Sequence, residues 1–284
     1  MGDYVALDES ANSPSPNLHL IGTDHPARLQ HQDILRHGSG QVAITPGGGE
    51  VLTAPAAFFS QWSYALERLF GYAVSHAFAR QGGAIMHGAA FELDHRAVLA
   101  LGLSRAGKST LSALALRAGA QVVSDDTLLV GQDRDGCTRV EALREEMYLR
   151  EPTQTLLPAA LQAGLQPTLL SGEHRWILDR SMAASFTRSI QPTLVLSTKV
   201  DRRLAATRFQ PMAKTDVLAE LIRAASPLFL SPRYPVERAA MLPVLMSLAL
   251  RAPAFRVRLG RDLFATPDAT FQRLLDETEA GSKP

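Results

Sequence analysis

The sequence predicts an α/β fold, and three observations support this class. An apolar run at 97–101 has the length of a buried strand, and the Ala/Leu-rich stretch 108–118 that follows a short loop has the pattern of a helix. A second short apolar run, 121–124, begins two residues after Gly119 and reads as another strand. Strands that alternate with helices in this way are typical of α/β sheets.

Composition limits the class of protein further. The chain has 284 residues, 46% of them hydrophobic, which suits one large domain or one domain with a smaller addition. A net charge of +1 gives no electrostatic basis for binding nucleic acid or an anionic membrane. The single cysteine, Cys137, cannot form an internal disulfide, and no Cys/His cluster suggests zinc. The N-terminus lacks a signal-peptide pattern and the apolar stretch 239–250 is too short to span a bilayer, so we expect a cytoplasmic protein.

Four segments follow from the composition along the chain. Residues 1–16 are polar and rich in Pro and Ser, which predicts a flexible leader. A small N-terminal α+β subdomain is predicted at 17–80, with short strands followed by a helix at about 57–80 whose apolar residues recur every three or four positions. Residues 81–275 form the predicted core, and 276–284 a flexible tail.

The predicted core contains further elements. A hairpin turn at 132–136 connects two strands, and the strictly alternating segment 254–259 reads as an edge or half-buried strand. The region 144–170 is mixed, with three prolines and no clear period. The other expected elements are strands at 84–93, 127–130, 138–142 and 192–197, helices at 214–225 and 237–251, and a short helix from Asp268.

The loop after the first strand carries the most informative motif. Residues 102–109 fit the pattern G-x-x-x-x-G-K-[ST], with Gly102, Gly107, Lys108 and Ser109 at the defined positions. Glycines allow the backbone to curve so that successive N–H groups point at phosphate oxygens, while the lysine reaches the β- and γ-phosphates and the serine binds Mg²⁺. The sequence therefore predicts a nucleotide phosphate site made of Gly102, Ser104, Arg105, Ala106, Gly107, Lys108, Ser109 and Thr110.

Two adjacent carboxylates, Asp125 and Asp126, end the strand that follows the helix. Ligands of open α/β sheets bind beyond the carboxyl ends of the strands, which places this pair near the phosphates. Adjacent side chains on an extended backbone point to opposite faces, so one can face a metal ion and the other an incoming hydroxyl. The alternative is that one of the two caps the next element or lies in solvent.

Three segments in this order resemble the HPr kinase/phosphorylase superfamily: Met86-His-Gly-Ala-Ala, Gly102-x-Ser-x-x-Gly-Lys-Ser-Thr and Gly119-Ala-Gln-Val-Val-Ser-Asp-Asp. The resemblance covers residues 84–130 and is strongest to the HPr-kinase-like branch that includes lasso-peptide (RiPP) tailoring serine kinases. It implies a P-loop, PEP-carboxykinase/HPr-kinase-like core that uses ATP and Mg²⁺.

The resemblance also implies roles for single residues. Asp125 takes the proton of the acceptor hydroxyl, Asp126 helps to hold the metal, Lys108 contacts the phosphates, and His87 lies near the acceptor. From the sequence alone, His87 reads equally well as a strand histidine bonded to a backbone carbonyl.

A later family segment supplies an arginine and an acidic metal residue. The corresponding region, 144–152, departs from the family signature, so HPr as acceptor and the phosphorylase activity lose support. Arg150 and Glu151 are the best matches, Arg144 and Glu145 the second choice, and solvated charges the alternative.

Two other groups are candidates for substrate contacts. Lys199, Arg202, Arg203 and Arg208 follow a predicted strand, and one of them, Arg203 for example, can stabilise the transferring phosphate; a solvated basic loop is the alternative. The stretch 173–176, which includes Trp176, is an undecided substrate or adenine contact.

The leading hypothesis is an ATP- and Mg²⁺-dependent kinase that phosphorylates a serine hydroxyl of a peptide or small protein, with a lasso or other ribosomally made precursor peptide as a candidate acceptor. A kinase for a small-molecule alcohol and a nucleotide-dependent regulatory switch are the alternatives. The expected partner is thus an acceptor peptide or small protein, without nucleic acid or membrane, and a homo-oligomer remains open.

Overall fold

The computed structural model describes residues 18–22, 34–37, 40–44, 50–54, 64–143, 146–170, 173–179, 185–225 and 235–280. The chain divides into two compact units, Met1–Ala77 and Phe78–Pro284. The leader expected at 1–16 lies outside the described residues, as do residues 281–284 of the expected tail. None of the helices in the described ranges has both the length and the apolar character that crossing a membrane requires.

The first unit contains a four-stranded sheet with the order β1-β4-β3-β2. Strands β1 and β4 are parallel, and the other neighbours are antiparallel. The short strands expected in this part of the sequence are therefore confirmed. Helix α1 runs without a break through Gly71 to Arg80, and the expected helical residues 57–63 lie outside the described ranges. The bounds are β1 Leu18–Gly22, β2 Ile34–His37, β3 Gly40–Ile44, β4 Glu50–Ala54 and α1 Tyr64–Arg80.

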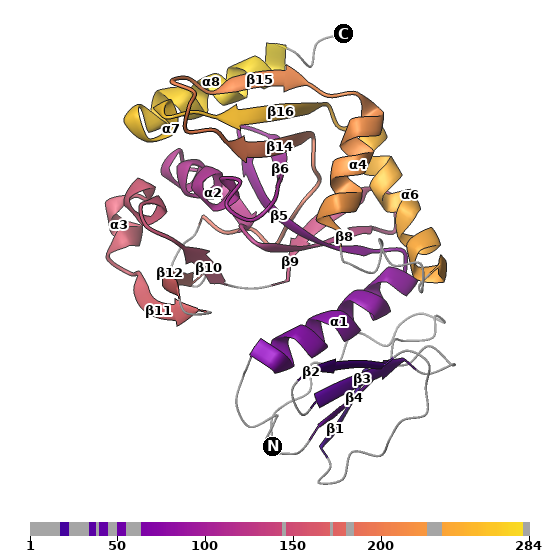
Figure 1. Cartoon of the computed structure of the whole chain (residues 1–284). Helices are drawn as coiled ribbons and strands as arrows, with labels where there is room; N and C mark the ends of the chain where they lie inside the picture. Colours follow the sequence, from indigo (N-terminus) through magenta and orange to yellow (C-terminus); the bar gives the residue numbers. More distant parts are fainter. Residues whose placement is uncertain are drawn as a thin grey trace. The chain divides into compact units, whose positions relative to one another are not determined.

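The second unit is a mixed α/β structure around a nine-stranded sheet (Figure 1), as the α/β prediction requires. The strand order is β13-β9-β8-β5-β6-β14-β16-β15, and β7 pairs with β5. Strands β6, β14 and β16 are parallel, while the other pairs are antiparallel. The strands are β5 Ala84–Leu93, β6 Arg96–Leu101, β7 Gln121–Ser124, β8 Thr127–Gln132, β9 Thr138–Ala142, β13 Ser189–Ile190, β14 Leu194–Val200, β15 Arg208–Pro211 and β16 Ala254–Leu259.

Helices cover both faces of this sheet (Figure 1), because the strand residues that alternate between the two faces are apolar on each. Val98 and Ala100 of β6 belong to one buried cluster with Leu114 of α2 and Leu274 of α8. Helices α4 and α6 lie on the other side. The helices are α2 Lys108–Arg117, α4 Lys214–Ala224, α6 Pro235–Arg251, α7 Asp262–Ala265 and α8 Pro267–Ala280.

A second, smaller sheet has the order β10-β12-β11 and was not predicted, since its sequence is interrupted by prolines. Both pairings in it are antiparallel. Its bounds, with the two short helices that accompany it, are β10 Glu146–Leu149, η2 Thr153–Leu156, α3 Ala159–Gln162, β11 Gln166–Leu170 and β12 Glu173–Asp179.

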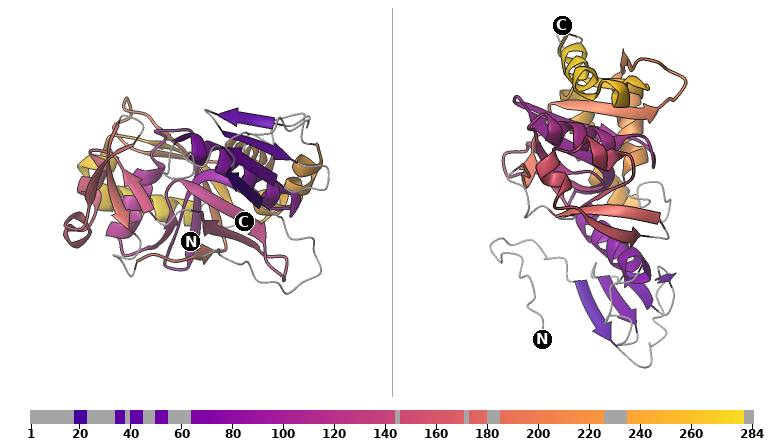
Figure 2. Two further views of the ribbon diagram at one scale, coloured as in Figure 1. Left: turned by 90° about the horizontal axis from the view of Figure 1, so that it is seen from below. Right: turned by 90° about the vertical axis from the view of Figure 1, so that its left-hand side faces the viewer.

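One of two expectations near the C-terminus was wrong. β16 is half-buried, one of the two forms expected for this strand, and it does not lie at the edge, because β15 pairs with its outer side. Helix α8 has 14 residues and continues to Ala280, into the range expected to be a flexible tail. Thr278 in its last turn is buried, and its hydroxyl donates a hydrogen bond to the carbonyl of Leu274 in the same helix at 2.9 Å. The right-hand view of Figure 2 shows α8, in yellow, beside the edge strand β15.

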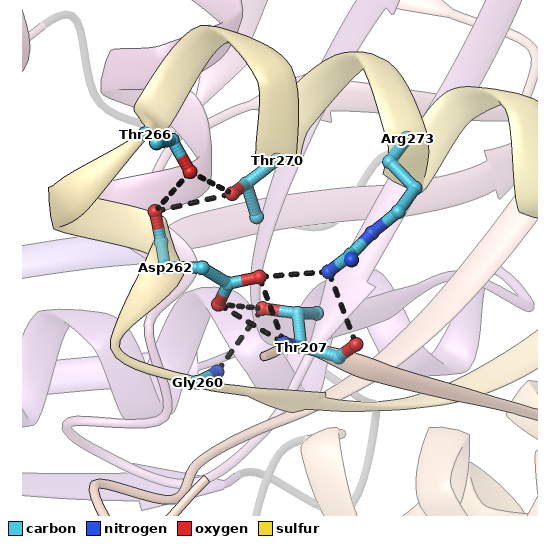
Figure 3. A network of polar contacts seen from close by, with 6 residues as sticks. All are labelled: Thr207, Gly260, Asp262, Thr266, Thr270 and Arg273. Atoms are coloured by element: carbon cyan, nitrogen blue, oxygen red, sulfur yellow. Dashed lines mark hydrogen bonds and ion pairs between the residues drawn. The ribbon is translucent and has the colours of Figure 1, made fainter. Parts of the chain in front are cut away.

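One polar network fixes these C-terminal elements to the sheet (Figure 3). The Asp262 carboxylate accepts hydrogen bonds from the Thr207 backbone N–H (2.9 Å), the Thr207 hydroxyl (2.8 Å) and Arg273 (2.7 Å). The Gly260 N–H donates to the same hydroxyl at 3.1 Å. A Cβ at Gly260 would lie 2.7 Å from the backbone carbon of Ala206, so this close approach requires glycine. The network holds the start of β15 against α7 and α8.

Candidate active site

The loop from β6 to α2 has the tight curvature that its glycines allow. Gly102 has φ +153° and Gly107 φ +97°, values that disfavour other residues. A Cβ at Gly102 would lie 2.7 Å from the carbonyl oxygen of Thr198, and one at Gly107 would lie 2.4 Å from Cδ1 of Leu259. Thr198 is in β14 and Leu259 ends β16, so the loop packs against two parallel strands at their carboxyl ends. The glycines are therefore required both by conformation and by space.

Lys108 is buried inside this loop. The residue is only 5% exposed, and its Nζ atom donates hydrogen bonds to the carbonyls of Gly102 (2.8 Å) and Leu103 (3.1 Å). Burial lowers the pKa of Lys108, and the carboxylates of Asp126 and Asp125 oppose that shift. The ammonium group thus lies within electrostatic reach of both aspartates.

The N-terminus of α2 opens onto the loop. Gly107 is its N-cap, no side chain caps the helix, and the first turn contains no acidic residue. The N–H groups of a helix's first turn have no partner within the helix, and together with the helix dipole they favour an anion. One expected contact residue faces elsewhere: the hydroxyl of Thr110 is buried 3.3 Å from that of Thr153 in η2.

The sheet register brings the aspartate pair to the start of the loop. The N–H of Gly88 in β5 donates to the carbonyl of Asp126 at 2.9 Å. On the other side of β5, Gly88 pairs with Leu101, the residue before the loop. Neighbouring strands are about 4.8 Å apart, so Asp126 lies roughly two strand spacings from Gly102. Segments that are more than twenty positions apart in the sequence therefore meet at one edge of the sheet.

Asp125 faces into this site. It is 3% exposed, and the Ser109 hydroxyl lies close enough to its carboxylate to lower its pKa. Within the described part of the chain, its Oδ1 atom is buried without a hydrogen-bond partner. Burial raises the pKa of Asp125 to about 7 and the nearby charge of Asp126 adds to the shift, while the Ser109 hydroxyl and the charge of Lys108 reduce it. A buried carboxylate oxygen without a partner beside a serine hydroxyl is a donor set that fits Mg²⁺.

Asp126 faces the other way and is partly exposed. Its Oδ1 lies 3.0 Å from Nδ1 of His87, and its Oδ2 accepts a hydrogen bond from the Thr127 hydroxyl at 2.9 Å. The two aspartates thus differ as expected for adjacent residues after a strand, since one is buried and the other is partly exposed. His87 contacts a carboxylate, not the backbone carbonyl that was its alternative.

The later candidates are placed less closely together. Glu151 is exposed and accepts a hydrogen bond from Gln154 at 3.4 Å. Arg203 is exposed in the loop after β14. The second choices, Arg144 and Glu145, lie outside the described residues. Among the residues that the structure describes, no group of three or more His, Cys, Asp or Glu side chains is arranged to hold a metal ion.

Arg150 belongs to a cluster that the sequence did not reveal as such. Its NH2 lies 2.7 Å from Oε2 of Glu173, the same carboxylate that binds Arg105 of the loop (2.9 Å) and Arg175 (2.6 Å). Glu173 and Arg175 are two positions apart on β12, so they share a face of that strand. The two-residue spacing of Glu173 and Arg175 is the signal in the sequence that could have revealed this cluster. It indicates a site only when the small sheet that brings Arg150 beside it is known.

No protein-family model matches the chain, and no curated protein matches its sequence. Among solved structures, the chain is similar to the Hpr(Ser) kinase/phosphatase from Coxiella burnetii, with 13% identity and a TM-score of 0.33. The alignment covers 69% of this chain and 93% of that one. At this TM-score the likeness supports no inference about activity.

Proposed function

We propose that this protein is an ATP- and Mg²⁺-dependent kinase that transfers the γ-phosphate to a serine hydroxyl of a peptide or small protein. The observation that carries the proposal is the contact between the buried Asp125 carboxylate and the hydroxyl of Ser109. It joins the first residue of the predicted aspartate pair to the glycine-rich loop, and the partly exposed Asp126 lies next to it. The site therefore contains residues that could bind a nucleotide phosphate, hold a metal ion and contact an acceptor hydroxyl.

The loop and α2 supply the donors for the nucleotide. The first-turn N–H groups of α2 and the Lys108 ammonium group would bind the β- and γ-phosphates. For this, Nζ of Lys108 would exchange its bonds to the carbonyls of Gly102 and Leu103 for phosphate oxygens. Because Lys108 is already held inside the loop, its side chain has little conformational entropy left to lose.

The contacts favour a division of roles between the aspartates that differs from the family assignment. Ser109 and Asp125 together would hold Mg²⁺, because phosphate-loop enzymes bind the metal through the loop hydroxyl and an aspartate at a strand end. Bound there, the metal ion would neutralise charge on the β- and γ-phosphates. Asp126 is then the residue available to the acceptor, and His87, 3.0 Å from its Oδ1, orients it.

In this arrangement the bonds formed and broken in the transfer can be stated. The serine oxygen forms a bond to the γ-phosphorus, the bond from that phosphorus to the leaving oxygen of ADP breaks, and the hydroxyl proton passes to the Asp126 carboxylate. Lys108 stabilises the charge on the transferred group. A lasso or other ribosomally made precursor peptide remains the candidate acceptor, on the sequence resemblance alone.

The test is incubation with ATP, Mg²⁺ and candidate serine peptides, followed by mass measurement for added phosphate. The parent should phosphorylate one of the peptides, and Ser→Ala in that peptide should prevent it. Asp126→Asn should abolish transfer while nucleotide binding survives, whereas Asp125→Asn should remove the dependence of nucleotide binding on Mg²⁺. If Asp125→Asn keeps that dependence and loses only transfer, the family assignment of Asp125 as base is correct.

ATP hydrolysis without an acceptor, together with a nucleotide-dependent change of shape, would instead favour a switch.

A further inference from the structure

Three arginines surround the carboxylate of Glu173 beside the phosphate loop. Arg105 comes from the loop, Arg150 follows β10, and Arg175 lies on β12 with Glu173. The register pairs Leu149, the last residue of β10, with Trp176, so that Arg150, the residue after β10, comes next to the position of Arg175. The fold therefore forces two guanidinium groups together.

The charges in this cluster do not balance. Three guanidinium groups and one carboxylate leave two positive charges in excess. Burial lowers the pKa of Arg175, and the positive charges of Arg150 and Arg105 lower it further, while Glu173 and Asp126 oppose the shift. The influence of Asp126 also shows that the cluster lies on the side of the loop where the aspartates are.

The arginines also have donors to spare. In the described part of the chain, the Nε atoms of Arg150 and Arg175 are buried and have no hydrogen-bond partner. The Arg175 side chain is 16% exposed and that of Arg105 is 72% exposed. Exposed ion pairs contribute little to stability, so stabilising the small sheet does not require the pair between Glu173 and the exposed Arg105.

We propose that Arg105, Arg150 and Arg175 form a second anion site beside the phosphate loop, which binds a phosphate group other than those held at the N-terminus of α2 and which Glu173 occupies when no phosphate is bound. A phosphate dianion carries the two negative charges that the cluster lacks. Planar guanidinium groups bind phosphate oxygens in pairs, and arginine is the side chain that best matches this geometry. The site deepens the proposed function and rests on it only in placing a nucleotide beside the cluster.

Glu173 has a defined part in this proposal. Its carboxylate contacts all three arginines at 2.6–2.9 Å, so an incoming phosphate must share or displace those contacts. Glu173 thus acts as an internal competitor that keeps the arginines together and lowers the affinity for phosphate. Glu173→Gln should therefore bind phosphate more tightly than the parent, which a purely structural carboxylate would not predict.

The experiment is calorimetric titration of inorganic phosphate into the full chain saturated with ADP and Mg²⁺, so that the phosphate loop is filled. The parent should bind phosphate, Glu173→Gln about tenfold more tightly and Arg175→Gln about tenfold more weakly. Arg139→Gln is the matched control, because Arg139 pairs with the single carboxylate Asp133 at 3.0 Å in the β8–β9 hairpin, and it should bind like the parent. If Arg175→Gln does not fold, the more exposed Arg105 gives the second variant, Arg105→Gln.

A non-hydrolysable ATP analogue in place of ADP separates two sources of the phosphate group. If the analogue prevents phosphate binding, and its own affinity falls in Arg175→Gln while that of ADP does not, the nucleotide's terminal phosphate is the ligand. If phosphate still binds beside the analogue, the group belongs to a second substrate. Either result supports the site.

The proposal is overturned if the parent and Glu173→Gln both fail to bind phosphate, or if the arginine variants bind it as the parent does. The proposed function fails differently, by absence of ADP binding. In that case inorganic phosphate is titrated into Lys108→Ala, whose phosphate loop lacks its main cation. Phosphate binding by this variant then still measures the affinity of the three arginines.

Discussion

Asp125→Asn should stabilise the free protein, and by an amount that depends on pH. The group's pKa moves from 3.8 to about 7 on folding because the carboxyl is buried. A shift of about 3 units corresponds to roughly 4 kcal/mol between the protonated and ionised forms. Because the folded-state pKa is the higher one, the unfolded chain loses this proton first. The free energy of unfolding of the parent therefore falls as the pH rises from about 4 to about 7, and does not fall further through this group above that range.

The measurement is urea unfolding of both proteins, without nucleotide or metal, at pH values from 5 to 8. The asparagine side chain does not titrate, so the stability difference in favour of the variant should grow over this range toward about 4 kcal/mol. Any loss of stability from the changed contact with Ser109 reduces that difference. Asp133→Asn is the control. The bond from Arg139 lowers the pKa of Asp133 below its usual 3.8, so this carboxyl is ionised in both states from pH 5 to 8, and the stability difference between Asp133→Asn and the parent should not change with pH. A difference between parent and Asp125→Asn that stays constant with pH would refute the reasoning.

Three further substitutions test other parts of the structure. Gly107→Ala should destabilise the protein by about 1–3 kcal/mol and prevent nucleotide binding, since its φ is +97° and its Cβ would lie 2.4 Å from Leu259; thermal unfolding and a nucleotide titration measure this. His87→Ala should lower kcat by about tenfold or more with little change in nucleotide affinity, because it orients Asp126 from 3.0 Å; equal losses in both would contradict a positioning role. Asp262→Ala should cost about 2–3 kcal/mol of stability, since it leaves the donors of Thr207 and Arg273 without their acceptor, whereas Asp262→Asn, which keeps one acceptor oxygen, should cost less. Unfolding of Asp262→Ala at the parent's denaturant midpoint would show that the network does not hold β15.

The sequence was most informative where a short-range pattern determines structure. The strand before Gly102, the helix from Lys108 and the hairpin near Gly136 were all predicted. Each depends on a local apolar period and on glycines at turns, where the backbone has a positive φ. The placement of Asp125 and Asp126 near the loop followed from the general position of ligands at strand ends.

The small sheet was missed for a physical reason. Strands β10, β11 and β12 are short, and they are stabilised by pairing with segments up to about thirty residues away, which no local period records. The roles of the two aspartates had the same difficulty. Adjacent residues must face different ways, but which of them faces Ser109 depends on the twist and register of β7 against β5.

The burial of Asp125 links stability to binding. An ionised carboxylate there is costly in the free protein, so the group holds a proton up to about pH 7. A divalent cation between Ser109 and Asp125 would favour the ionised form, so that binding would expel the proton whenever the pH is below that value. Mg²⁺ affinity and free-protein stability should then change in opposite directions with pH, because both depend on the same proton. The unpartnered Oδ1 atom is thus a cost to the free protein that binding would relieve.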